Sequence, residues 1–173
     1  MATRIIRRTF QLKPTILSAV DTHVEKYARE HVINSCDEKD GYITSIDNVT
    51  VESIDVCETT SFLNVNVNIE STCVKPETGS KYSGRICLIF DMGILINVAG
   101  VLKVLVPMND NVCIINGKER RMLYYSETGL LKTIDDQRPS IVLQKNDMLS
   151  VEVTGVQYNY STNSYNCFGN IMY

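Results

Sequence analysis

The sequence lacks the features that mark membrane and secreted proteins. No apolar run approaches the roughly 18 residues that a membrane-spanning helix needs. The first residues, Met-Ala-Thr-Arg-Ile-Ile-Arg-Arg, do not contain the apolar core of a signal peptide. We therefore expect an intracellular protein that is not integral to a membrane.

Patterns typical of metal sites are also missing. The six cysteines include no C-x-x-C pair, whereas zinc sites usually take ligands in close pairs because one turn then supplies two of them. His23 and His31 have no Cys or acidic partner in a ligand spacing. We expect no metal or cofactor, histidines at the surface or at the edge of an apolar stripe, and reduced cysteines that pack as small core residues. The cysteines are Cys36, Cys57, Cys73, Cys87, Cys113 and Cys167.

A catalytic nucleophile with an evident base is missing as well. The chain contains no G-x-S-x-G, no phosphate-binding loop and no H-E-x-x-H. The adjacent carboxylates Asp135 and Asp136 lie in a polar stretch beside Arg138, where exposure to solvent is the favoured interpretation. The sequence therefore predicts a protein without catalytic residues of its own, and measurable hydrolytic turnover would contradict this.

Composition and charge are those of a globular chain of one or two domains. Hydrophobic residues make up 44% of the 173 positions and charged residues 21%. Residues 1–80 carry 8 basic and 12 acidic side chains, net −4, and residues 81–173 carry 9 basic and 8 acidic, net +1. The second part is the better neighbour for phosphate, but no cluster of Lys and Arg predicts strong binding to nucleic acid.

The first part of the chain has the pattern of a strand followed by a helix. Alternation from Ile5 to Leu12 predicts a strand with an exposed basic edge formed by Arg4, Arg7 and Arg8. After Pro14, apolar residues recur at three- and four-residue steps, which predicts an amphipathic helix that ends between Asn34 and Asp37. The apolar stripe consists of Ile16, Leu17, Val20, Val24, Tyr27, Ala28 and Val32.

Three further strands are predicted before residue 75. They span residues 41–47, 49–56 and 62–74, and the last alternates strictly, as a half-solvated antiparallel strand does. Its inward residues are Leu63, Val65, Val67 and Ile69, and its outward residues are Asn64, Asn66, Asn68 and Glu70. The resulting order is β-α-β-β-β, and one helix on such a sheet leaves edges for another domain or a partner to cover.

The second part begins with the stretch Lys81–Pro107, which reads as a three-stranded meander. Short β-branched runs are separated by Asp91-Met92-Gly93 and Ala99-Gly100. In the second run, alternation places Ile94, Ile96 and Val98 on one face and Leu95 and Asn97 on the other. In the third run, it places Leu102, Val104 and Val106 on one face and Lys103 and Leu105 on the other. A meander with one buried face is how a small β-barrel begins.

Two later strands complete the predicted barrel. Residues 108–138 look like an irregular polar insertion, and strands are expected at 149–158 and 165–172. Five strands in this order favour an OB fold, and such barrels often bind single-stranded nucleic acid. Tyr158, Tyr160 and Tyr165 surround the last turn, where packing of the hairpin is favoured over a stacking platform.

Several residues, in order along the chain, resemble one protein family. A helix-to-strand turn of that family is similar to Ser35-Cys36 followed by Gly41-Tyr42-Ile43. The family's domain junction is similar to Lys75-Pro76 with Gly79, Gly84 and Gly93. Its third barrel strand is similar to Gly100-x-x-Lys103-Val104-x-Val106. The family is the larger stalk subunit of DNA-directed RNA polymerase, represented by the seventh subunit of eukaryotic RNA polymerase II and by its counterpart in the archaeal enzyme. The similarity extends over nearly the whole chain.

The resemblance implies an α+β chain of two domains. Residues 1–78 would form a truncated RNP-like β-α-β-β-β domain that docks on the polymerase, and residues 79–173 a five-stranded OB-fold barrel of the RNA-binding type. The protein would be a non-catalytic subunit that forms the stalk with a smaller subunit, supports initiation and guides nascent RNA. Its partners would be polymerase core subunits, that smaller subunit, single-stranded RNA and initiation factors. The alternative is an independent OB-fold RNA-binding module that serves translation or RNA processing.

The resemblance also implies positions for the two binding functions. Polymerase or partner docking would fall at Ser35, Gly41, Tyr42, Lys75 and Pro76, and weak RNA binding at Tyr82, Arg85, Phe90, Met92, Leu95 and Lys103. Related RNA-binding barrels carry aromatic rings at the positions of Met92 and Leu95, and the loop from Val56 to Ser61 lacks the Pro and Gly of the family's tip loop. Such a divergent chain is expected in the nucleus if it is a eukaryotic cellular protein, and in the virion or a cytoplasmic virus factory if it is a viral copy.

Overall fold

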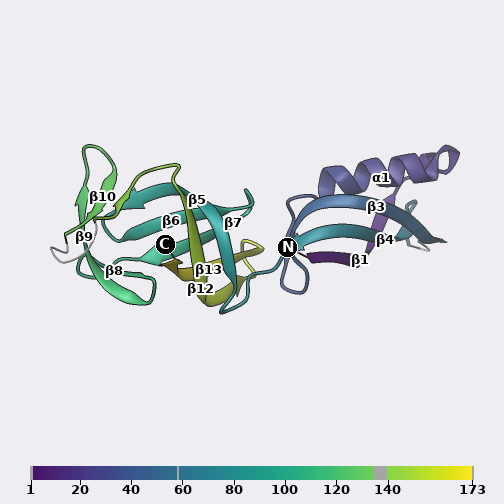
Figure 1. Cartoon of the computed structure of the whole chain (residues 1–173). Helices are drawn as coiled ribbons and strands as arrows, with labels where there is room; N and C mark the ends of the chain where they lie inside the picture. The colour runs from purple at the N-terminus through teal and green to yellow at the C-terminus, as the bar shows by residue number, and fades with distance from the viewer. Residues whose placement is uncertain (1, 58, 135–139, 173) are drawn as a thin grey trace. The chain divides into compact units, whose positions relative to one another are not determined.

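The computed structural model describes residues 2–57, 59–134 and 140–172 (Figure 1). Within these ranges the chain is mostly β with one α-helix, and that helix is not long and apolar enough to span a membrane. The chain divides into two compact units, Met1–Lys75 and Pro76–Tyr173.

The first unit is an antiparallel sheet with a helix on one face. Its strands lie in the order β1-β4-β3-β2, and Figure 1 shows α1 packed along one side of this sheet. Its elements are β1 (Ala2–Leu12), the 3-10 helix η1 (Pro14–Ser18), α1 (Val20–His31), β2 (Cys36–Asp37), β3 (Gly41–Val56) and β4 (Leu63–Val74).

Strict alternation along β4 places its two faces in different surroundings. The side chains of Val65, Val67 and Ile69 are buried beneath α1 together with Val24 and Ala28. Burying each such side chain contributes about 1.5–3 kcal/mol, so the helix is held chiefly by this apolar contact. The other face is polar, with Asn64, Asn66 and Asn68 partly exposed. The alternation predicted for this strand is confirmed.

The predicted helix is interrupted at Ala19. This residue has φ −159° and ψ 65°, so the chain leaves helical geometry between η1 and α1. The two segments are therefore out of phase, and Leu17, predicted to lie in the apolar stripe, is 58% exposed. Pro14 occupies the first turn of η1, as expected, because its missing N–H is not needed there.

The two strands predicted at 41–47 and 49–56 are one continuous strand, β3. Pairing with β4 shifts register at three places, between Ile43 and Ser45, between Ile46 and Asn48, and between Val51 and Ser53. A bulge absorbs the extra residue without ending the strand, so the polar Asp47-Asn48 step does not separate two strands.

The second unit contains a closed five-stranded barrel. Its strands are β5 (Lys81–Phe90), β6 (Gly93–Val98), β7 (Leu102–Pro107), β12 (Met148–Asn159) and β13 (Ser164–Met172). They pair in the order β12-β5-β6-β7, and β13 closes the ring by antiparallel pairing with β12 and parallel pairing with β7. The barrel is OB-like, as the succession of strands predicted.

The meander of β5, β6 and β7 has the predicted faces. Ile94, Ile96 and Val104 are almost completely buried in the barrel, whereas Lys103 is exposed. Gly93 is required at the turn into β6, because a Cβ there would lie 2.5 Å from the carbonyl oxygen of Val106.

The stretch after β7 is wrongly predicted as irregular. It forms the strands β8 (Val112–Ile115), β9 (Lys118–Tyr125), β10 (Leu130–Thr133) and β11 (Val142–Leu143), which extend the sheet beyond β13. Asn116 and Gly117 both have positive φ, 52° and 71°, and form the two-residue turn between β8 and β9. An Asn-Gly pair between alternating segments is the sequence signal for this hairpin. The carboxylates Asp135 and Asp136 and the neighbouring Arg138 lie outside the described residues.

Candidate functional site

Four apolar side chains form a row across the outer face of the barrel. Strand register pairs Leu88 with Leu95, Leu95 with Leu105, and Leu105 with Phe168, so one row crosses β5, β6, β7 and β13. Leu88 is 52% exposed and Phe168 43% exposed. We call these four residues the apolar row. Polar residues normally occupy the solvent face of such strands. Covering the apolar row with a ligand or partner would therefore be favourable.

A bulge in β5 brings Leu88 to this surface. Ile86 and Ile89 both point into the barrel, and the register with β6 shifts between Ile86 and Leu88. The Cys87 thiol donates a hydrogen bond to the Leu95 carbonyl oxygen at 3.1 Å, which ties the bulge to β6. Without the extra residue, alternation would turn Leu88 into the barrel.

A second row, beside the first, carries positive charge. Arg85 pairs with Asn97, and Asn97 pairs with Lys103, so the two exposed cations flank one amide across three strands. We call these three residues the basic row, and Met148 extends it on β12 as the partner of Arg85. An apolar surface bordered by separated cations could bind a single-stranded nucleic acid, whose bases would lie on the apolar row and whose phosphates would meet the cations.

The structure brings five of the six expected RNA-binding residues to this side of the barrel. Arg85 and Lys103 belong to the basic row and Leu95 to the apolar row. Phe90 and Met92 lie where β5 turns into β6, and Met92 is 70% exposed.

Tyr82 lies apart from these residues. It pairs with Val151, a residue whose side chain is completely buried, so alternation points Tyr82 to the inner side of β5. Burial raises the pKa of the Tyr82 hydroxyl above its ordinary value. Tyr82 is therefore not part of the outer surface.

Sequence reasoning missed half of this surface. Leu88 was hidden by the bulge, which no residue type announces. Alternation places Leu105 and Asn97 on the outward face, but neither is among the residues expected to bind RNA. The outward position of Phe168 follows from alternation with the buried Tyr165 and Cys167, so this residue could have been identified.

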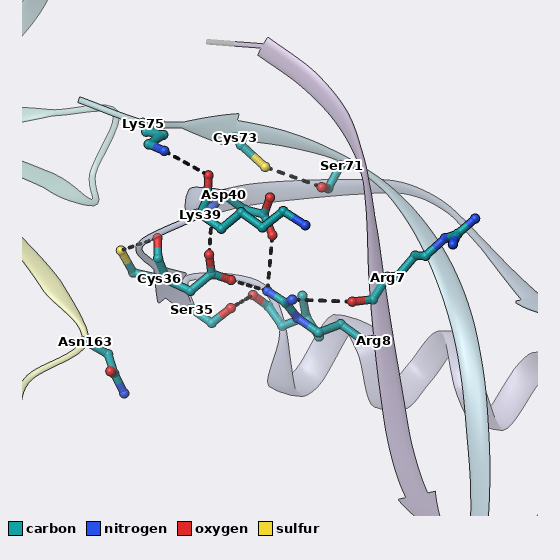
Figure 2. Close-up of polar contacts among 12 residues, drawn as sticks. Arg7, Arg8, Ser35, Cys36, Lys39, Asp40, Ser71, Cys73, Lys75 and Asn163 are labelled. Atoms are coloured by element: carbon teal, nitrogen blue, oxygen red, sulfur yellow. Dashed lines mark hydrogen bonds and ion pairs between the residues drawn. The ribbon is translucent and has the colours of Figure 1, made fainter. Parts of the chain in front are cut away.

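Two of the expected docking residues, Ser35 and Lys75, lie near the turn from α1 into β3 (Figure 2), and Gly41 and Tyr42 begin β3. The Ser35 hydroxyl donates to the Val32 carbonyl oxygen at 2.6 Å and satisfies the end of the helix. Gly41 has φ 83°, and a Cβ there would lie 2.5 Å from the Val74 carbonyl oxygen. Tyr42 is 8% exposed. These three residues build the turn itself.

Charged groups brace the same turn. The Arg8 guanidinium pairs with the Asp37 carboxylate and lies 3.6 Å from Asp40, whose backbone N–H donates to Asp37 Oδ1 at 2.7 Å. Lys75 Nζ donates to the Lys39 carbonyl oxygen at 3.1 Å (Figure 2). Pro76, the last of the expected docking residues, begins the second unit.

The tyrosines at the last turn have divided roles. Tyr158 meets both Tyr160 and Tyr165 edge to face, with ring centroids 5.0 Å apart in each pair. Tyr165 is 7% exposed and packs the hairpin, whereas Tyr160 is 70% exposed. The group is chiefly hairpin packing with one ring left at the surface.

The histidines and cysteines show no arrangement that could hold a metal within the described residues. His23 and His31 are exposed, as predicted, and His31 stacks on Tyr27 with centroids 4.0 Å apart. All six cysteines are free thiols, but only Cys73, Cys113 and Cys167 are buried as predicted. Cys57 differs most, because a hydrogen bond from the Thr59 hydroxyl lowers the pKa of its thiol to about 7.

No protein-family model matches this chain, and no curated protein is significantly similar to it.

Proposed function

We propose that this chain is a non-catalytic stalk subunit of a multisubunit DNA-directed RNA polymerase. The observation that carries the proposal is the succession of a small helix-backed sheet and an OB-like barrel with an apolar and a basic row on its outer face. In this role the first unit docks on the enzyme with a smaller subunit, and the barrel meets the emerging transcript.

The order of elements in the first unit supports the docking role. β1, α1, β3 and β4 follow one another, and β4 lies between β1 and β3. This order is similar to that of the first four elements of a β-α-β-β-α-β domain, which supports the proposal of a truncated RNP-like domain. Such a truncated sheet has an edge and a face that a larger assembly can cover.

The outer face of the barrel supports contact with RNA. In OB folds the second and third strands, here β6 and β7, are the usual surface for oligonucleotides. Only one exposed aromatic ring, Phe168, lies in the apolar row, and base stacking contributes about 1–3 kcal/mol per base. We therefore expect weak binding with little sequence preference.

Purification of the tagged chain from its native source tests the proposal. The expected result is co-elution with the large polymerase subunits and a 1:1 complex with a second small subunit. A monomeric chain that elutes without polymerase would overturn the proposal.

The exposed row also favours a second candidate, an independent RNA-binding module. The two candidates differ in the affinity of the isolated chain. An independent module should have measurable affinity for single-stranded RNA at moderate salt, and this affinity should fall as the salt concentration rises. A stalk subunit should have measurable affinity only at low salt. Fluorescence anisotropy with a labelled RNA of about 20 nucleotides at two salt concentrations separates them.

A further inference from the structure

The longest regular sheet edge of the first unit belongs to β1. β1 pairs with β4 on one side, and no strand within residues 2–57, 59–134 and 140–172 pairs with its other side. Eleven consecutive residues, Ala2 to Leu12, pair with β4 without a register shift. A long straight edge with unpaired backbone groups is a template for another strand.

The opposite edge of the same sheet is protected. Three register shifts interrupt the pairing of β3 with β4, and the short strand β2 pairs with β3 at Gly41 and Tyr42. Bulges twist an edge and disturb the spacing of its N–H and C=O groups, which discourages a further strand. The sheet is therefore asymmetric, and of its two edges in the described residues the regular β1 edge is the better suited to extension.

The side chains of β1 indicate the charge of the missing strand. The segment Ala2–Leu12 carries Arg4, Arg7 and Arg8 and no acidic residue. Arg8 is engaged with Asp37 and Asp40, but the Arg7 side chain is 79% exposed and reaches Glu52 only at 4.0 Å.

Arg4 has no carboxylate within 4.0 Å in the part of the chain that the structure describes. Ile5 is 72% exposed and lies on the same face of the sheet as Arg7, whereas Arg4 shares the face of the buried Ile6. An incoming strand would therefore meet one available cation on each face of the sheet, with the apolar Ile5 beside Arg7.

A second copy of this chain would bring like charges together at this edge in the register centred on Ile6. Antiparallel pairing of two β1 strands about Ile6 would place Arg4 of each copy opposite Arg8 of the other. Like charges directly opposite one another destabilise a strand pair. A strand with Asp or Glu facing Arg4 and Arg7 has the complementary charge.

We propose that the free edge of β1 receives an extended acidic strand from the smaller partner subunit, with an apolar residue packed on Ile5. The identity of this partner rests on the proposed function. The strand would extend the sheet by backbone hydrogen bonds, and Arg4 and Arg7 would fix its register through charge.

Hydrogen exchange of the free chain and of its purified polymerase complex tests this inference. Amides in residues 2–12 should exchange at least about tenfold more slowly in the complex, because their outward N–H groups become paired. A complex that leaves the exchange of β1 unchanged would overturn the inference but keep the proposed function. If no polymerase complex forms, both proposals fall.

Charge reversal gives a second test. The double variant R4E/R7E should weaken binding of the partner by at least about tenfold, and Lys26→Glu on the exposed side of α1 should leave it unchanged. Thermal unfolding of each variant checks the fold, and the milder Arg7→Ala should show a smaller loss in the same direction. Equal affinity for R4E/R7E and the unmodified chain, or a dimer of the isolated chain that R4E/R7E alone abolishes, would refute an acidic partner strand.

Discussion

The two units each expose one sheet face, and these faces differ in how they are satisfied. On the first unit the Asn66 side chain donates to Ser53 Oγ at 2.8 Å and to Asp55 Oδ2 at 3.0 Å, and accepts from the Thr9 hydroxyl at 2.7 Å. On the barrel the apolar row offers no hydrogen bonds to itself and remains partly exposed. A side chain such as Asn66, whose polar groups already bond to neighbours, gains little from a ligand, whereas an exposed apolar row gains from any flat partner.

The cysteines give the largest expected contrast between the units. Alkylation by iodoacetamide between pH 6 and 9 should modify Cys57 at least about a hundredfold faster than Cys167, because thiolate is the reactive form. The Cys57 pKa of about 7 means that its rate should rise through pH 7, whereas burial raises the pKa of Cys167 to about 11. Peptide mass spectrometry resolves the two sites, and comparable rates would show that the barrel is not closed around Cys167.

Neighbouring residues of β6 test the inside and outside of the barrel. Ile96→Ala should lower the free energy of unfolding by about 2–5 kcal/mol, because it leaves a cavity among fully buried side chains. Leu95→Ala, one residue away on the outer face, is the matched control and should cost less than about 1 kcal/mol. Urea unfolding measures both, and equal losses would contradict the assigned faces.

Removal of the exposed ring tests the contrast between the faces as ligand surfaces. Phe168→Ala should weaken binding of single-stranded RNA by about tenfold at low salt, which corresponds to about 1.4 kcal/mol. Asn64→Ala on the polar face of the first unit should leave affinity unchanged. Anisotropy titrations measure the RNA affinity of both variants. If Phe168→Ala leaves the affinity unchanged, RNA does not bind at the apolar row.

The polar network of the first unit should show the smallest effect. Asn66→Ala removes three partly exposed hydrogen bonds and should lower the free energy of unfolding by about 1 kcal/mol. Thr50→Ala removes a hydrogen bond of 3.4 Å to the Asn68 carbonyl oxygen and should cost less. If Asn66→Ala unfolds like the unmodified chain, the network does not stabilise this face.

Alternation made much of the fold predictable. β4 and the meander of β5 to β7 have a regular period of two, and this period shows directly which face of the strand each side chain occupies. The OB-like barrel followed from the number and spacing of these strands. The parallel contact between β7 and β13 did not, because it joins residues far apart in sequence.

The errors arose where one residue changes the phase. Ala19 separates two helical segments without Gly or Pro to announce it, and this put Leu17 at the surface. The bulge at Cys87 did the same for Leu88, so the apolar row could not be assembled from the sequence. Asn116-Gly117, in contrast, is a recognisable hairpin signal, but the polar composition of residues 108–138 favoured an irregular stretch there.

The parallel pairing of β13 with β7 has a consequence for synthesis of the protein. β13 is the strand that closes the barrel, and it is made after the other strands of that ring. Translation adds about 5–20 residues per second, so the meander waits several seconds with an unpaired edge on β7. The first unit has all its strands by Val74 and can fold in that interval. The barrel therefore passes through a stage with an unpaired edge on β7, which is prone to aggregation until β13 is made.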